Sequence, residues 1–327
     1  MKILIAGLGS IGRRHLRNLL ALGEKDIILY RTHFGTLPDD EIASFPVETE
    51  LEAALAHKPD AVIIANPTAL HLDVAIPAAE AGCHLFIEKP VSHSPERIDE
   101  LKAALKRGGG KVLVGFQFRF HPTLRRVAEW LRADEIGKPL TFHAEWGEYL
   151  PGFHPWEDYR KSYAARSDLG GGVVRTLSHP IDYLRMLLGE VSALWAFTGK
   201  TSDLEIDVED TAEIGLKFAL GTVGTLHLDY YRRPTQHKLE IIGSKGLIEW
   251  SNTTNAARLY RAEVDAWESC LAPEKFERND MFLSEMSHFI QVARGEVEPA
   301  CTLEDGLRVQ ELVQAIYDSA GRYAIAR

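Results

Sequence analysis

The amino-acid sequence predicts an α/β protein built from two domains. Apolar runs alternate with helical patterns up to about residue 120, which is typical of a parallel sheet with helices on both faces. Beyond that point, short apolar runs follow one another at close spacing and are joined by glycine-containing turns. We therefore expect a doubly wound parallel sheet over residues 1–120 and an α/β domain with a mainly antiparallel sheet over residues 121–327.

The chain begins with a glycine-rich turn between an apolar run (residues 2–6) and a helical pattern (residues 13–22). In such a turn the first glycine permits a sharp bend, the second lets a pyrophosphate approach the backbone, and the third lets the helix pack close to the strand. The N–H groups at the start of the helix then face the phosphates, so we expect dinucleotide binding. An ordinary tight turn is the alternative. The predicted cofactor-binding residues here are Gly7, Gly9, Ser10, Ile11 and Gly12.

The second expected strand, residues 26–30, is followed by Arg31, Thr32 and His33. A site selective for NAD usually places Asp or Glu there, because a carboxylate accepts a hydrogen bond from the ribose 2′-OH. An arginine can instead pair with a 2′-phosphate, so Arg31 and Thr32 favour NADP over NAD. Stacking of Arg31 on the adenine, or its exposure to solvent, is the alternative.

Three more apolar runs, residues 60–65, 84–87 and 111–115, are expected as strands of the same sheet. We expect Pro77 to start a new turn in the helix between the first two of them, or to kink it. Ligands of such sheets bind at the carboxyl ends of the strands. The polar motifs at those ends are Asn66-Pro67, Glu88-Lys89-Pro90 and residues 117–120. The helices expected in this half are residues 51–57, 68–81 and 95–107.

The second half begins with an expected helix and strand and continues into an aromatic-rich irregular stretch, residues 151–168. A triple glycine then leads into one long expected helix, residues 173–188. The other elements expected here are helices at 122–133, 280–294 and 303–323 and strands at 140–149, around Trp195, and at 211–218, 223–231, 238–242 and 247–250.

Composition narrows the class of protein. The net charge of −10 over 327 residues argues against a dedicated nucleic-acid binder or a binder of anionic membranes. Cys83, Cys270 and Cys301 have no spacing that suggests a disulfide framework or a zinc site, and no metal is expected. The chain shows no secretory leader and no apolar run long enough to span a bilayer. We expect a soluble cytoplasmic protein with free thiols.

Lys89 is the first candidate for proton transfer. A lysine at a strand end, half buried beside a cationic cofactor ring, has a lowered pKa and can exchange a proton with a substrate hydroxyl. A cis bond before Pro90 would fix the direction of Lys89. A solvated surface lysine is the alternative.

The expected helix at residues 173–188 carries three polar residues at i, i+4 and i+7, which share one face: Arg175, His179 and Asp182. His179 is a natural general acid or base near neutral pH. The alternative is a core histidine hydrogen-bonded to Asp182. Aromatic residues between 153 and 163 could stack on a sugar ring, pack in the core, or contact another subunit.

The chain resembles the glucose-fructose oxidoreductase / inositol dehydrogenase family, also called Gfo/Idh/MocA. The resemblance extends over nearly the whole chain and implies an N-terminal Rossmann domain and a second domain with a large open, mainly antiparallel sheet. It also implies NAD(P)-dependent hydride transfer to or from a secondary alcohol of a sugar or cyclitol, and a homodimer or homotetramer. The motifs that carry it are residues 7–12, Asn66-Pro67-Thr68-Ala69-Leu70-His71, Glu88-Lys89-Pro90, and the triple glycine 170–172 leading to His179-Pro180-Ile181-Asp182.

The resemblance also assigns residues. Lys89 and His179 match the family's catalytic lysine and histidine. The cofactor-site positions it implies are Asn66, Pro67, His71, Glu88 and Lys89, and our substrate-site candidates are Arg119, Tyr149, Trp156, Tyr163, Arg175 and Asp182.

Arg175 stands where many family members carry an aspartate. Arginine cannot act as a base, and it disfavours protonation of a nearby histidine. Two interpretations follow: Arg175 clamps a carboxylate or phosphate of the substrate, or the site is catalytically altered.

We therefore expect an NADP(H)-preferring dehydrogenase or reductase acting on a sugar, a cyclitol, or an anionic or nucleotide-linked sugar derivative. A non-catalytic cofactor-binding relative and an NAD-dependent glycoside hydrolase are the alternatives.

Overall fold

The computed structural model describes residues 1–32, 40–153 and 158–320. The chain forms two compact units. The first contains residues 1–117 and 277–310, and the second contains residues 118–276 and 311–327. The first crossing between the units, at 117/118, lies within three residues of the expected boundary, whereas residues 277–310 belong to the first unit.

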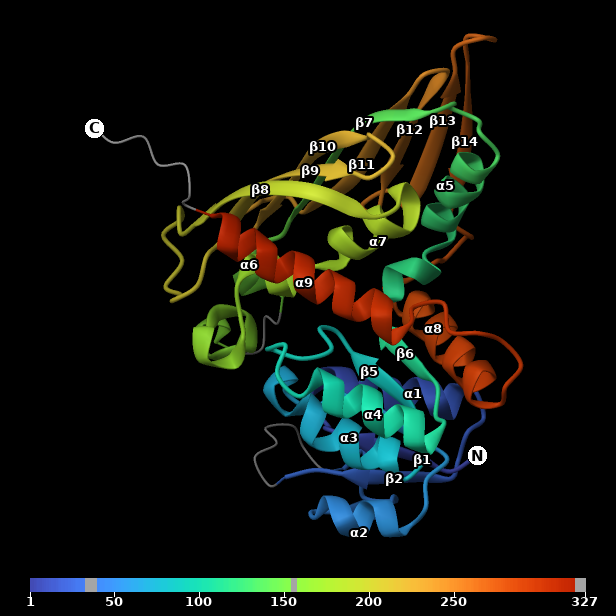
Figure 1. Ribbon diagram of the computed structural model, residues 1–327, viewed down its shortest axis with the longest axis vertical. Helices are drawn as coiled ribbons and strands as arrows, with labels where there is room; N and C mark the ends of the chain where they lie inside the picture. The colour runs from blue at the N-terminus through green and yellow to red at the C-terminus, as the bar shows by residue number, and fades with distance from the viewer. Residues whose placement is uncertain (33–39, 154–157, 321–327) are drawn as a thin grey trace. The chain divides into compact units, whose positions relative to one another are not determined.

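The first unit contains a six-stranded parallel sheet in the order β3-β2-β1-β4-β5-β6 (Figure 1). The apolar runs of the sequence supply four consecutive buried residues each in the inner strands β1 and β4. Such runs are expected of strands covered on both faces. The strands are β1 (Ile3–Ala6), β2 (Ile27–Tyr30), β3 (Val47–Glu48), β4 (Ala61–Ile64), β5 (His84–Glu88) and β6 (Val112–Gly115).

The helices of the first unit depart from the sequence prediction at several ends. Helix α1 begins at Ser10, three residues earlier than predicted, and α3 continues through Pro77 without starting a new helix. The predicted start of α4 at residue 95 is wrong, because Arg97 takes a left-handed conformation (φ 63°) and the helix begins after it. The helices are α1 (Ser10–Ala21), α2 (Leu51–Ala56), α3 (His71–Glu80), α4 (Ile98–Gly108) and α8 (Arg278–Ala293).

The second unit contains an eight-stranded sheet in the order β14-β13-β12-β11-β7-β10-β9-β8, in which only β7 and β10 pair in parallel. The last two strands were not predicted. The strands are β7 (Pro139–Gly147), β8 (Val191–Gly199), β9 (Thr211–Phe218), β10 (Val223–Asp229), β11 (Gln236–Gly243), β12 (Gly246–Ser251), β13 (Ala256–Arg261) and β14 (Ala266–Leu271).

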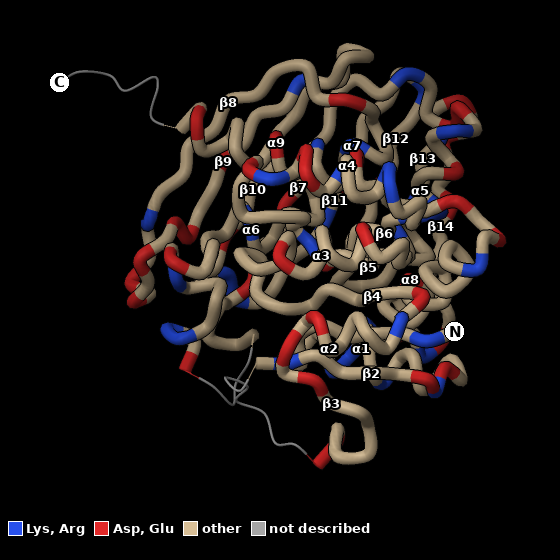
Figure 2. Tube along the Cα trace, turned by 60° about the horizontal axis from the view of Figure 1, so that its bottom comes forward, with Lys and Arg blue, Asp and Glu red and all other residues tan. Residues whose placement is uncertain are grey.

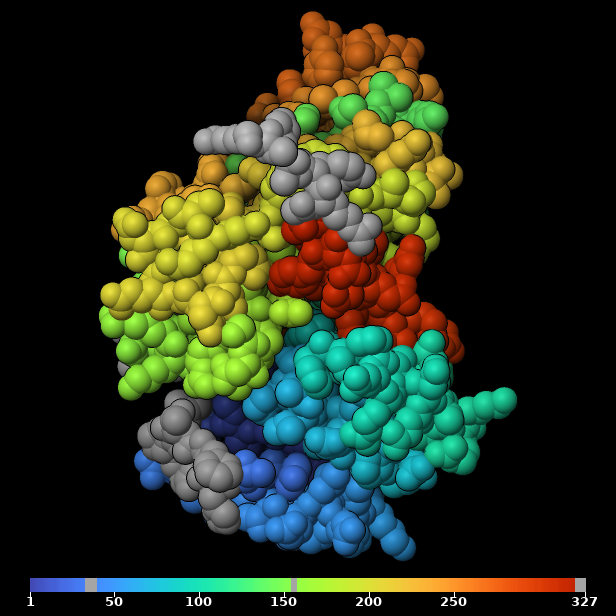
Figure 3. Space-filling view, turned by 60° about the vertical axis from the view of Figure 1, so that its left-hand side comes forward, coloured from blue at the N-terminus to red at the C-terminus, as the bar shows by residue number. Residues whose placement is uncertain are grey.

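Helices α5 (Pro122–Arg132), α6 (Val173–Thr176) and α7 (His179–Leu188) belong to the second unit. The single helix predicted over 173–188 is wrong, since Leu177 and Ser178 separate α6 from α7. Helix α9 (Leu303–Ser319) passes from the first unit into the second after residue 310. The end of α9 contacts β8, where Ser319 Oγ accepts a hydrogen bond from Ala196 N at 3.2 Å. In the space-filling view of Figure 3, α9 is red.

Basic and acidic residues are interspersed along the chain in both units (Figure 2). Many of them form ion pairs across neighbouring elements, for example Lys111 Nζ with Glu298 at 2.8 Å. Within the described ranges, no helix combines the length and apolar character needed to cross a membrane.

Candidate functional site

The glycine turn between β1 and α1 has the geometry that dinucleotide binding requires. Gly7 has φ +94°, and a Cβ on it would lie 2.4 Å from Asn66 N. A Cβ on Gly12 would lie 1.9 Å from the carbonyl oxygen of Gly7, so the helix packs as close to the strand as its backbone allows. Gly9 and Ser10 are exposed and Ile11 is half-buried at the start of α1, and no atom of the described residues lies within 4 Å of a Cβ placed on Gly9. A phosphate has room to reach the first N–H groups of α1 there.

The ends of β4 and β5 are joined by a buried histidine. His71 is 1% exposed, and its Nδ1 and Nε2 lie 3.0 Å from the carbonyl oxygens of Pro90 and Asn66, respectively. Burial lowers the pKa of His71, whereas the contacts with the carbonyl oxygens of Asn66 and Pro90 raise it. In its neutral form the imidazole donates to one of these two carbonyl oxygens. Asn66 Nδ2 also donates to Leu70 O at 3.0 Å, and the neighbouring Pro67 is exposed. His71 thus holds two strand ends of the predicted site in register.

Glu88 and Lys89 end β5 in a charged, partly buried setting. Glu88 Oε1 lies 2.7 Å from Nε2 of His15, whose side chain is fully buried, and Glu88 Oε2 accepts from Lys89 N at 3.3 Å. Burial lowers the pKa of Lys89 to about 8, with Glu88 opposing and Arg278 adding to the shift. The Lys89-Pro90 peptide bond is cis, as the sequence suggested. Lys89 therefore has a pKa that allows it to lose or gain a proton near neutral pH.

Arg31 and Thr32 follow β2 at the same edge of the sheet. Arg31 N donates to Glu48 O of β3 at 3.1 Å, the Arg31 residue is half-buried, and Thr32 is exposed. His33 lies outside the described residues.

In the second unit, Arg119 and Asp182 form a buried ion pair. Arg119 Nε donates to both Asp182 oxygens at 3.1 and 2.9 Å, and Arg119 Nη2 donates to Oδ1 at 2.6 Å. The two side chains are 8% and 1% exposed. The alternative for His179 in the sequence analysis paired it with Asp182, and the structure shows that Asp182 accepts hydrogen bonds from Arg119. Both are substrate-site candidates, and the structure brings these two together.

His179 is the first residue of α7 and is 3% exposed. Its ring centroid lies 5.1 Å from that of Phe118 and 5.9 Å from that of Trp146. Trp146 also stacks on the buried His237 at 4.3 Å. This aromatic surrounding fixes the plane of the His179 imidazole.

The guanidinium of Arg175 packs against α9, within the second unit. Its Cζ lies 4.6 Å from the ring centroid of Tyr317, and its Nη1 donates to Gly171 O at 3.5 Å. The Tyr317 hydroxyl donates to Glu209 Oε1 at 2.7 Å, and Arg175 also acts electrostatically on Glu209. Because α6 and α7 are separate helices, the i, i+4 and i+7 argument does not place Arg175 on one face with His179 and Asp182.

The remaining substrate-site candidates are aromatic. Tyr149 follows β7, and the guanidinium of Arg233 lies 4.1 Å from its ring centroid. Tyr163 is 50% exposed. Trp156 lies outside the described residues.

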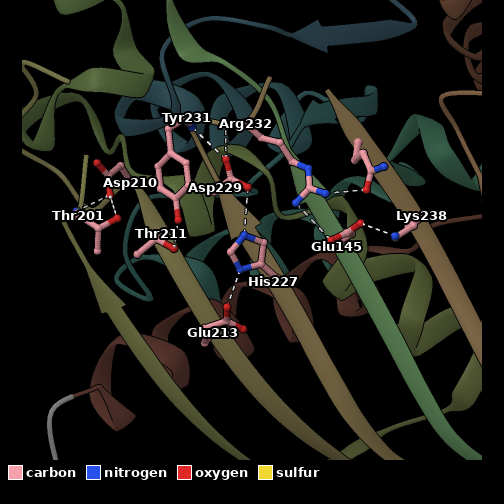
Figure 4. Close-up of polar contacts among 11 residues, drawn as sticks. Glu145, Thr201, Asp210, Thr211, Glu213, His227, Asp229, Tyr231, Arg232 and Lys238 are labelled. Atoms are coloured by element: carbon pink, nitrogen blue, oxygen red, sulfur yellow. Dashed lines mark hydrogen bonds and ion pairs between the residues drawn. The ribbon is translucent and has the colours of Figure 1, made fainter. Parts of the chain in front are cut away.

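One face of the eight-stranded sheet carries a row of polar side chains, as Figure 4 shows. His227 lies between Glu213 and Asp229, with nitrogen–oxygen distances of 2.7 and 3.0 Å. Both contacts raise the pKa of His227, the one with Asp229 most. Beside this row, Glu145 on β7 pairs with Lys238 on β11 at 2.8 Å. The exposed Trp195 and Phe197 of β8 lie on the same face by register.

Sequence reasoning missed several residues around these sites. His15 contacts Glu88, and Glu209 and Tyr317 support Arg175. Each pair is separated by many residues along the chain, so no local pattern signals it. A local signal did exist at Pro180, because proline is favoured in the first turn of a helix, as in α7, although Pro77 lies inside α3.

Comparison with known proteins agrees with the fold and the glycine turn. Residues 1–116 match the family described as "Oxidoreductase family, NAD-binding Rossmann fold", and residues 124–249 match "GFO/IDH/MocA C-terminal domain". The myo-inositol 2-dehydrogenase of Thermotoga maritima is 29% identical over 94% of this chain and 92% of its own length.

Two further comparisons extend the similarity over most of the chain. The D-xylose 1-dehydrogenase (NADP(+)) 2 of Haloferax volcanii is 26% identical over 86% of this chain and 84% of its own length. The structure of a levoglucosan dehydrogenase with NADH and levoglucosan superposes with a TM-score of 0.87 at 20% identity and covers 98% of this chain and 97% of that one, which supports the fold. With both of its domains matched, the chain belongs to the Gfo/Idh/MocA family of NAD(P)-dependent oxidoreductases.

Proposed function

We propose that this oxidoreductase transfers a hydride between a nicotinamide cofactor and a secondary alcohol or ketone of a sugar, cyclitol or sugar derivative. The observation that carries the proposal is the setting of Lys89: a half-buried amine at a strand end, with a pKa lowered to about 8. The names of the compared relatives, which include inositol, xylose and levoglucosan dehydrogenases, support a polyhydroxylated substrate.

Different residues would bind the cofactor, transfer the proton and bind the substrate. Gly7, Gly9 and Gly12 with the start of α1 would hold the dinucleotide phosphates, since they leave the backbone N–H groups accessible. When bound, the nicotinamide would supply the hydride chemistry. Lys89 would take the hydroxyl proton during oxidation, and His179 would orient that hydroxyl and share the proton. A clamp by Arg175 on an anionic substrate group stays a prediction.

The activity is tested with purified protein, NAD or NADP, and a panel of polyols and sugars, by following absorbance of the reduced nicotinamide. Turnover with at least one cyclic polyol or sugar supports the proposal. Retained nucleotide binding without turnover would favour a non-catalytic relative. Cleavage of a glycoside with cofactor that is never consumed would favour a hydrolase.

We propose a preference for NADP over NAD on the basis of Arg31 at the end of β2. We expect NADPH to bind at least tenfold more tightly than NADH, because a phosphate–guanidinium pair contributes about 1.5–3 kcal/mol. Arg31→Ala should weaken NADPH binding and leave NADH binding unchanged, and Arg107→Ala serves as an exposed control. Fluorescence titration measures both, and tighter binding of NADH by the wild-type protein would contradict the preference.

We further propose a homo-oligomer that forms through the face of the eight-stranded sheet that carries the polar row of Figure 4. Phe197 is 58% exposed on that face, next to the polar row of Figure 4. Phe197→Glu would place a carboxylate beside Glu213, and we expect it to shift the protein to monomer. Size-exclusion chromatography with light scattering measures the mass. Leu20→Glu, at a position 42% exposed on α1, is the control and should leave the mass unchanged.

We place the protein in the cytoplasm, since all three of its cysteines are free thiols, which suits a reducing compartment.

A further inference from the structure

Two arginines of the first unit share one aromatic ring. The Cζ of Arg14, on α1, lies 4.7 Å from the ring centroid of Phe282, and the Cζ of Arg278, the first residue of α8, lies 5.8 Å from the same centroid. Phe282 is 4% exposed and therefore gives both guanidiniums a fixed apolar support. Arg14 Nη1 also donates to Asn279 Oδ1 at 3.1 Å. The two cations are thus positioned by contacts that do not neutralise them.

These two arginines differ from the neighbouring arginines of α1 in whether a carboxylate pairs with them. Arg13 and Arg17 on the same helix both pair with Glu41. Within residues 1–32, 40–153 and 158–320, neither Arg14 nor Arg278 forms an ion pair with a carboxylate. Arg278 is exposed, and it lies at the start of a 16-residue helix whose first N–H groups are already capped by Glu277, in a capping box with Asp280. An anion that binds here would therefore pair with the guanidiniums themselves.

Lys89 belongs to the same electrostatic neighbourhood. Burial lowers the pKa of Arg14, and Arg278 and Arg17 lower it further. Arg278 also acts on Lys89, as described above. Glu88 is the carboxylate that acts on both Arg14 and Lys89, and it is hydrogen-bonded to His15. His15 follows Arg14 on α1 and contacts Glu88 at 2.7 Å, and Glu88 accepts from Lys89 N at 3.3 Å. These contacts place Arg14 and Lys89 in one part of the first unit, with the carboxylate of Glu88 between them.

We propose that Arg14 and Arg278 bind a carboxylate or phosphate group of the substrate beside Lys89. The substrate is then an anionic sugar derivative, such as a sugar acid or a sugar phosphate. The inference rests on the proposed function, because Lys89 marks the reacting end. It differs from the clamp by Arg175, which lies in the second unit against Tyr317.

The test uses the full-length protein saturated with its reduced cofactor, and malonate and inorganic phosphate as probes in isothermal titration calorimetry. We expect the wild-type protein to bind at least one probe, and Arg278→Gln to weaken that binding roughly tenfold or more, the size of one lost charge-assisted hydrogen bond. Arg14→Gln should do the same, while Arg278→Lys should retain part of the affinity. Arg107→Gln, which removes an exposed charge elsewhere in the first unit, is the matched control.

Three results would overturn the proposal. These are no binding of either probe by the wild-type protein, equal binding by Arg278→Gln, and loss of probe binding only in Arg175→Gln. Titration of each variant with NADH and NADPH tests whether the two arginines bind an anionic group of the substrate or a phosphate of the cofactor. Affinities within about threefold of wild type support a substrate group, whereas a tenfold loss of dinucleotide affinity assigns the two arginines to a cofactor phosphate and overturns the proposal. If the wild-type protein binds neither dinucleotide, the proposed function fails, and the same probes without cofactor still test the anion site.

Discussion

Replacing Lys89 by methionine should reduce turnover by about 10²–10⁴-fold, the usual contribution of a positioned general acid or base. Methionine keeps the length and apolar stem of the side chain but removes the amine, so packing at the end of β5 should survive. Binding of reduced dinucleotide should change little, because the glycine turn supplies the phosphate contacts. Steady-state kinetics with the best substrate of the panel, together with a fluorescence titration, measure both quantities. Lys102→Met, at an exposed position on α4, is the control.

The pH dependence gives an independent check on the same residue. A pKa of about 8 means that Lys89 becomes neutral as the pH rises through 8. A base for alcohol oxidation must be neutral, so kcat/KM for oxidation should rise with pH through this value and level off above it. For ketone reduction the protonated amine is required, and kcat/KM should fall over the same interval. A profile without any change between pH 7 and 9, or a Lys89→Met enzyme with more than a tenth of wild-type turnover, would contradict the assignment.

The first unit was the more predictable from sequence, for a physical reason. Its parallel strands are buried on both faces and therefore appear as continuous apolar runs, such as 61–64, and the glycine turn is a local motif. The predicted helix boundaries were wrong where the backbone conformation of a single residue determines the start of the helix. Arg97 delays α4 by adopting a left-handed conformation, which no propensity would assign to an arginine.

The second unit and the site contacts depend on pairings between distant residues. Strands β13 and β14 were missed because they bury few residues: β13 buries Ala257 and Leu259, and no residue of β14 is buried. The turn between them contains Asp265, which has φ 47°. The sequence shows that Arg175 replaces the aspartate of many family members. Its contact with Tyr317 could not be predicted, because more than a hundred residues separate the two along the chain. Local patterns identify which residues are polar at a strand end or on a helix, whereas tertiary packing decides what they touch.

Breaking the Arg119–Asp182 pair should cause the largest loss of stability in the second unit. Its side chains are 8% and 1% exposed, so each charge is shielded from water and compensated by the other. Asp182→Asn should lower the free energy of unfolding by about 3–5 kcal/mol, the cost of leaving a buried charge uncompensated. Arg119→Met should have an effect of similar size. Denaturant unfolding followed by tryptophan fluorescence measures the change.

The double variant Arg119→Met/Asp182→Leu distinguishes a charge effect from a packing effect. If the loss comes from an uncompensated charge, removing both partners should cost less than either single replacement, because no ion remains in the interior. If it came from packing, the losses would add.

Asp168→Asn tests the same chemistry at the surface pair Arg166–Asp168, whose side chains are 44% and 60% exposed, and should leave stability unchanged within error. Near-wild-type stability in both single variants would contradict the buried-pair interpretation. If instead the double variant folds but binds substrate poorly, the pair also serves the candidate site by fixing the start of α7, on which His179 stands.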